Sequence, residues 1–75
     1  MTTSRKPHAR RIRAAREDRQ LSIYAAAKAA GIPWSTWSNY EKRGAMPPLD
    51  VASRIAAVLG VSTDWIANGV SHNVS

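Results

Sequence analysis

Apolar residues recur at helical spacing along most of this chain, and short segments rich in glycine, proline and polar residues separate the apolar stretches. The clearest pattern follows the sequence GAMPP, a turn made of helix breakers. From residue 49 to residue 59, apolar side chains return every three or four positions until Gly60 is reached. The predicted buried face of this helix consists of Leu49, Ala52, Ile55, Ala56 and Leu59.

Capping residues divide the rest of the chain into further helices. Serine is a favoured N-cap, glycine ends helices in the left-handed conformation, and proline suits the first helical turn. We therefore expect helices from about His8 to Arg19, from the Ser22 cap to Gly31, from Pro33 to Lys42 or Arg43, and from the Ser62 cap to Gly69. Residues 8–69 then form one domain between a flexible basic arm, residues 1–7, and a flexible tail, residues 70–75.

The composition favours an all-α fold, a compact bundle of five short helices. The chain has 75 residues and no cysteine, and it is rich in alanine, the best helix former. Because a chain this short has one small core, its stability must come from close packing rather than from disulfides or thiolate metal sites. The apolar runs are too short to span a membrane and the N-terminus lacks a secretory apolar segment, so we expect a cytoplasmic protein.

The sequence also argues against catalysis and against metal or cofactor binding. His8 and His72 lie in opposite terminal tails, and no cysteine or cluster of carboxylates has the spacing of a metal site. The sequence contains no glycine-rich phosphate loop. We therefore expect no enzyme activity, no cofactor and no metal.

Positive charge is concentrated at the start of the chain, which has a formal net charge of +6. The basic residues of this region are Arg5, Lys6, Arg10, Arg11, Arg13, Arg16 and Arg19. Such a run is either a solvated terminus or an arm that binds a polyanion, and composition alone does not separate the two. Arg16 shares a helical stripe with Ile12 and Ala15, so it needs a partner near the core.

The segment GIPWSTWSNYEKRG, residues 31–44, has two chemically different sides. As a helix it places Trp37, Tyr40 and Glu41 on one side. The other side consists of Trp34, Ser35, Ser38 and Asn39. Ala27 precedes the turn at Gly31, so the preceding helix has a small residue where the next helix crosses it closely. We expect Trp37 and Tyr40 to face the core, which leaves the polar side outward.

These features together resemble the helix-turn-helix repressors of the Cro/CI (XRE) type. The sequence LSIYAAAKAAGIPWSTWSNYEKRG is similar to the helix-turn-helix of this family, and LGVSTDWIANG is similar to the closing helix of lambdoid phage repressors. The resemblance covers about residues 10–69. It implies a lambda-repressor-like fold with the helix-turn-helix at the second and third helices. It also implies a sequence-specific regulator that inserts the helix at residues 33–43 into the major groove of double-stranded DNA.

The resemblance implies different roles for different surface residues. The base-contacting residues are then Trp34, Ser35, Ser38 and Asn39. The residues that contact the DNA backbone are Arg5, Lys6, Arg10, Arg11, Ser22, Tyr24, Lys28, Lys42 and Arg43. Asn39 suits sequence recognition best, because its carboxamide matches the donor and acceptor pattern of adenine. For Trp34, contact with bases and partial burial at the start of its helix both remain open.

The resemblance also implies an ion pair between Arg16 and Glu41, since the family often pairs an arginine of the first helix with a glutamate at the end of the recognition helix. Three features depart from the family pattern. Ile23 replaces the frequent glutamine at the start of the motif, Pro33 replaces the usual serine or threonine cap, and we expect the GAMPP loop to be longer. The phosphate contacts of these regions therefore stay open, with Tyr24 as a substitute for the glutamine that Ile23 replaces.

Regulators of this type commonly bind palindromic operators as symmetric dimers, with half-sites about one helical turn apart, roughly 34–36 Å. We expect the homodimer interface at Trp65, Ile66 and Val70, unless Trp65 only closes the core. The resemblance thus implies a phage or prophage-type repressor in the bacterial cytoplasm or nucleoid. Two alternatives remain open: an antitoxin-like or adapter module whose main partner is another protein, and a basic RNA-binding domain. A complete Cro-like protein and the head of a longer repressor both fit this sequence.

Overall fold

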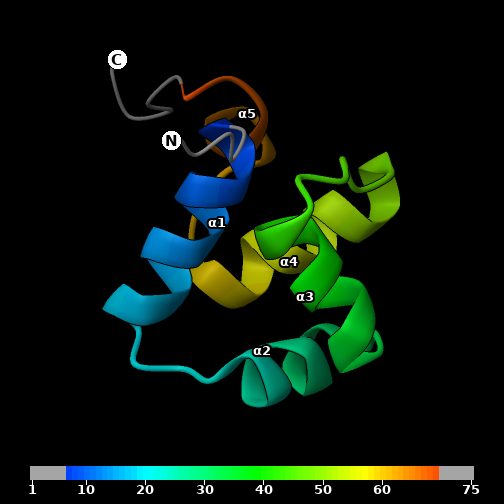
Figure 1. Cartoon of the computed structure of the whole chain (residues 1–75). Helices are drawn as coiled ribbons and strands as arrows, with labels where there is room; N and C mark the ends of the chain where they lie inside the picture. The colour runs from blue at the N-terminus through cyan, green and yellow to red at the C-terminus, as the bar shows by residue number, and fades with distance from the viewer. Residues whose placement is uncertain (1–6, 70–75) are drawn as a thin grey trace, which may run out of the picture.

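The structure is a computed structural model that describes residues 7–69, and all of the regular structure in this range is helical (Figure 1). The elements are α1 (Pro7–Asp18), α2 (Ile23–Ala30), α3 (Trp34–Lys42), α4 (Leu49–Leu59) and α5 (Thr63–Asn68). The predicted all-α class and the five-helix bundle are confirmed. None of the helices within residues 7–69 is long and apolar enough to cross a membrane.

The helix ends follow the capping signals of the sequence. The Ser22 hydroxyl accepts a hydrogen bond from the Ala25 amide at 3.0 Å, and the Ser62 hydroxyl accepts one from the Trp65 amide at 2.9 Å. Pro33 differs from the prediction, because it is the extended N-cap of α3 (φ −63°, ψ 146°) and not its first helical residue. Its ring removes an amide hydrogen that would have no partner inside the helix, so no helical hydrogen bond is lost, but proline provides no side-chain cap for α3.

The core lies between α1, α2, α3 and α4, and α5 closes it by packing on α1 and α4. Alanines supply the α2 contribution, and these small side chains let α3 and α4 approach closely. Trp37 and Tyr40 of α3 fill the space that the alanines leave. The buried core residues are Ile12, Ala26, Ala27, Ala30, Trp37, Tyr40, Ile55, Ala56, Leu59 and Ile66.

The predicted buried face of α4 is wrong at its first residue. Leu49 is 77% exposed, whereas Ile55, Ala56 and Leu59 are buried. The first turn of α4 lies at the outer edge of the molecule, away from α1, in Figure 1. Helical spacing correctly placed Leu49 on the same side of α4 as the buried residues, but no neighbouring helix covers this side at the first turn.

The turn between α1 and α2 contains a left-handed residue that is not glycine, Gln20 with φ 60°. The Leu21 amide donates to the Arg16 carbonyl at 3.1 Å across this turn, so the conformation is held in place. The left-handed region costs a residue with a Cβ about 1 kcal/mol or more, and glycine avoids this cost.

We expect Gln20→Gly to raise the free energy of unfolding by about 0.5–1 kcal/mol, measured by urea denaturation. Gln20→Ala is the matched control and should leave stability unchanged within a few tenths of a kcal/mol, because it keeps the Cβ at the same φ. A Gln20→Gly protein that is less stable than the parent would contradict the assignment of strain to this residue.

Candidate nucleic-acid interface

The pair α2–α3 forms a rigid corner with α3 on the outside. Gly31 adopts the left-handed conformation (φ 75°) at the C-cap of α2, and the Ile32 amide donates to the Ala27 carbonyl at 3.0 Å. Ala27 is 1% exposed, so the crossing of the two helices leaves no space for a larger side chain. Trp37, with no exposed surface, anchors α3 from behind. The opposite side of α3 therefore points away from the core.

The outward side of α3 carries the residues predicted to contact bases. Ser35 and Asn39 are exposed, Ser38 is half-buried, and Trp34 is 59% exposed. This surface offers two hydroxyls and one carboxamide, which can donate and accept hydrogen bonds, beside one large aromatic ring. Such groups match the edges of base pairs in a major groove, which is wide enough to admit a helix.

Residues predicted to contact phosphates lie on both sides of this surface. Tyr24 and Lys28 of α2 line a shallow groove together with Trp34, which brings these three residues together at the α2–α3 corner. Ser22 is exposed at the start of α2. Lys42 and Arg43 are exposed at the far end of α3. Positive charge thus flanks the polar side of α3 at both ends.

A hydrogen-bonded ion pair fixes α3 to α1. Arg16 Nε donates to Glu41 Oε2 at 2.6 Å, and Arg16 Nη2 donates to Glu41 Oε1 at 3.0 Å. Trp37 Nε1 donates to the same Oε2 atom at 2.6 Å, and Arg16 Nη1 donates to the Leu21 carbonyl at 2.7 Å. The hydrogen bond to Glu41 raises the pKa of Arg16, so the guanidinium stays charged at every pH at which the fold persists.

The structure thus brings together the two residues that the family resemblance pairs, Arg16 and Glu41. The sequence interpretation missed the third member, Trp37. Its spacing of one helical turn before Glu41 is the signal that could have revealed the indole hydrogen bond. Because Glu41 is 2% exposed and Trp37 has no exposed surface, this network holds α3 mainly through buried groups.

His8 is a further residue whose role the sequence interpretation missed. The prediction that His8 lies in a terminal tail is wrong: it belongs to the first turn of α1 and is 5% exposed. Its Nε2 atom donates to the Gly44 carbonyl at 3.0 Å and to the Ala45 carbonyl at 3.2 Å. His8 therefore ties the start of α1 to the loop that follows Lys42 and Arg43.

Two predicted backbone-contacting residues lie elsewhere. Arg10 and Arg11 border a hollow beside Trp65, and Arg11 Nε donates to the Ile66 carbonyl at 3.1 Å. The Arg11 guanidinium therefore lies at the end of α5 rather than beside α3, and its contact with the DNA backbone stays a prediction. Arg5 and Lys6 lie outside the described residues.

The predicted homodimer interface is wrong at Ile66. This side chain is 1% exposed and belongs to the core, because α5 turns that side toward α1 and α4. Trp65 is half-buried and packs against the core from the outside. Val70 lies outside the described residues.

The described residues contain no group of three or more histidine, cysteine, aspartate or glutamate side chains that could hold a metal ion. The α2–α3 corner combines exposed polar and basic groups from two neighbouring elements.

Comparison with known proteins identifies the family to which the chain belongs. The Helix-turn-helix family model matches residues 12–66, so the chain belongs to this family, the XRE-type helix-turn-helix proteins. The chain is also similar to a solved structure, the N-terminal DNA binding domain of SinR from Bacillus subtilis. The TM-score is 0.78 and the identity 25%, and the match covers 88% of this chain and 96% of the SinR chain. A search of the curated proteins found no match to the chain.

Proposed function

We propose that this protein is a DNA-binding transcriptional regulator that reads a specific duplex sequence with the outward side of α3. The observation that carries the proposal is the division of α3 into two sides. Trp37 and Glu41 bind one side to the rest of the protein, while Ser35 and Asn39 stand exposed on the other. The membership of the XRE-type family and the likeness to a DNA-binding domain support the same function.

In this proposal the exposed side of α3 enters the major groove and the flanking groups meet phosphates. Trp34, Ser35, Ser38 and Asn39 contact bases, and Ser22, Tyr24, Lys28, Lys42 and Arg43 contact the DNA backbone. Arg5 and Lys6 add backbone contacts from the start of the chain. Trp34 is exposed enough to reach DNA, and its place beside Tyr24 and Lys28 also shields the start of α3.

We further infer that the regulator acts as a repressor of phage or prophage type in the bacterial cytoplasm and pairs on a palindromic operator. One domain of this size reads only a few base pairs, and two copies bound one helical turn apart double the recognised length. Since Ile66 is buried, the contact between two copies excludes that side chain.

Selection of bound sites from random DNA duplexes tests the proposed function. We expect enrichment of a palindrome whose half-sites lie about 34–36 Å apart, or a multiple of this spacing. Binding without any sequence preference, or stronger binding to structured RNA than to every duplex, would contradict it.

The salt dependence of DNA binding tests the phosphate contacts. The slope of log K against log salt is negative, and its magnitude is expected to fall by about 0.9 for each phosphate contact removed, so Lys42→Ala combined with Arg43→Ala should make the slope less negative by about 2. Removal of residues 1–6, which include Arg5 and Lys6, should act in the same direction. Arg13→Ala is the matched control, because Arg13 is exposed on α1 and pairs with Glu17. An equal slope for parent and double variant would exclude Lys42 and Arg43 from the interface.

A further inference from the structure

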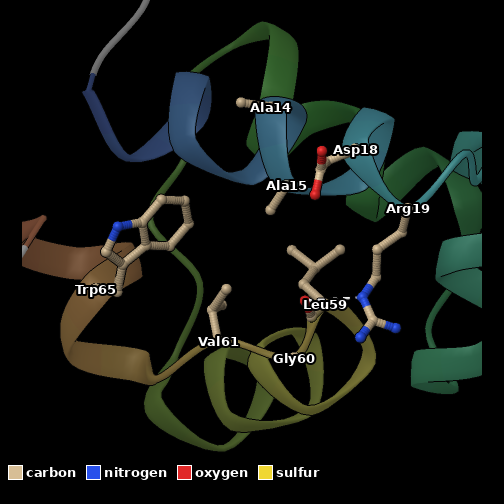
Figure 2. Close-up of a pocket in the computed structure, with 8 residues that line it drawn as sticks. All are labelled: Ala14, Ala15, Asp18, Arg19, Leu59, Gly60, Val61 and Trp65. Atoms are coloured by element: carbon tan, nitrogen blue, oxygen red, sulfur yellow. Dashed lines mark hydrogen bonds between the residues drawn. The ribbon is translucent and has the colours of Figure 1, made fainter. Parts of the chain in front are cut away.

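A groove runs along the other side of the molecule, between α1 and the segment that joins α4 to α5 (Figure 2). Its main hollow has a volume of about 510 Å³, and a second hollow of about 330 Å³ continues past Trp65 toward the start of α1. Both hollows share Ala14 and Trp65. The apolar floor consists of Ala14, Ala15, Leu59, Val61 and Trp65.

The backbone holds one arginine beside each hollow in the same way, Arg19 at the main hollow and Arg11 at the second. Arg11 Nε donates to the Ile66 carbonyl at 3.1 Å, and Arg19 Nε donates to the Leu59 carbonyl at 3.0 Å. Both guanidinium groups also lie against a glycine at a helix end. A Cβ added at Gly60 would meet Arg19 Nη2 at 2.7 Å, and one at Gly69 would meet Arg11 Nη1 at 3.0 Å.

One terminal nitrogen of each guanidinium thus lies against its glycine, and the hydrogen-bond donors of the terminal nitrogens are unused within the described residues. Within residues 7–69, neither Arg11 nor Arg19 forms a hydrogen bond through its Nη atoms. A guanidinium that is already held by Nε loses less conformational freedom when a carboxylate binds to its outer edge. Arg10 adds a third positive charge to the groove, and Asp18 is its one acidic lining residue.

The groove is independent of the proposed DNA-binding surface. None of its lining residues belongs to α2 or α3. The helix α5, which supplies Trp65, packs on α1 and α4. A segment bound in the groove therefore does not occupy the polar side of α3.

We propose that this groove binds an acidic amphipathic peptide segment of a partner protein, with apolar side chains on the floor and carboxylates at the arginines. The arginines at the border favour an acidic segment, and the apolar floor favours a segment that also carries apolar side chains. A second copy of the chain would bring another molecule of net charge +6 against a basic groove, so the pairing on an operator proposed above uses a different surface. A nucleic acid would place phosphates over the Leu59 and Val61 side chains, which offer them no hydrogen bond.

The test is selection of random twelve-residue peptides displayed on phage against the full-length protein, followed by affinity measurement with the synthesised peptides. We expect the selected sequences to combine two or more large apolar residues with flanking Asp or Glu. In the NMR spectrum, the bound peptides should shift the indole signal of Trp65 and leave the Asn39 side-chain signals in place.

Two groove variants make the test specific. Ala14 is exposed, so Ala14→Trp fills the groove without entering the core and is expected to weaken peptide binding at least tenfold. Arg10→Ala is expected to weaken it about threefold to tenfold, whereas Arg13→Ala, on the same helix but outside the groove, should have no effect. Far-UV circular dichroism and urea denaturation confirm that each variant is folded.

Several results would overturn the proposal. Selected peptides that lack acidic residues, or whose binding is unchanged by Ala14→Trp, place the partner elsewhere. A parent protein that self-associates and becomes monomeric in Ala14→Trp assigns the groove to a second copy, and a loss of DNA affinity in Ala14→Trp assigns it to nucleic acid. Failure of the peptide proposal and failure of the proposed DNA-binding function can be distinguished, because Asn39→Ala should leave peptide binding intact.

Discussion

Replacing Glu41 by alanine is expected to lower the free energy of unfolding by about 3 kcal/mol or more. The substitution removes the acceptor of two hydrogen bonds from Arg16 and one from Trp37. It leaves the Arg16 guanidinium largely buried without its partner charge, and it leaves the fully buried Trp37 indole nitrogen without an acceptor. Urea denaturation followed by tryptophan fluorescence and by circular dichroism measures the loss.

Two control variants separate the ion pair from other effects. Glu17→Ala removes an acidic residue from the exposed pair with Arg13, where both side chains are about half exposed, and should cost less than about 1 kcal/mol. Glu41→Gln keeps an acceptor for Trp37, so its free energy of unfolding should lie between those of the parent and Glu41→Ala. If Glu41→Ala is as stable as Glu17→Ala, the pair with Arg16 does not hold α3 in place.

Replacing Asn39 by alanine is expected to remove about 1–3 kcal/mol of discrimination at one base pair of each half-site. Asn39 is exposed on the outward side of α3, so the substitution deletes a donor and an acceptor without disturbing the core. Affinity for unrelated DNA should stay nearly constant, because phosphate contacts carry most of the nonspecific binding. Repeating the site selection with the variant measures the change, position by position.

The matched control for Asn39→Ala is Ser35→Ala, which removes one hydroxyl from the same side of α3. We expect a smaller loss of discrimination, since a single hydroxyl bonds to several kinds of base edge and distinguishes them poorly. An Asn39→Ala protein that selects the parental operator with unchanged preference at every position would show that Asn39 does not read the sequence. Equal unfolding midpoints for both variants would confirm that the comparison concerns DNA recognition alone.

Local chemistry made the helices and the two sides of α3 predictable. Ser22, Gly31 and Ser62 act within one helical turn, so their neighbours in sequence suffice to position the helix ends. The turn at Gly31 and the helical period place Trp37 and Tyr40 opposite the polar residues of α3, whatever the rest of the fold does. The family resemblance supplied the Arg16–Glu41 pair, which composition and spacing do not identify.

The sequence by itself therefore determined the helices, most of their caps and the polar side of α3, because these follow from contacts within a few residues. Only the tertiary structure decided which residues near the helix ends are exposed and which are buried, because that depends on how the helices pack. His8 meets the Gly44 carbonyl across 36 residues, and Arg11 meets the Ile66 carbonyl across 55. The same packing left Leu49 uncovered, turned Ile66 inward and formed the groove along α1. Helical periodicity contains no information on the angle between two helices, so these features could not be predicted from it.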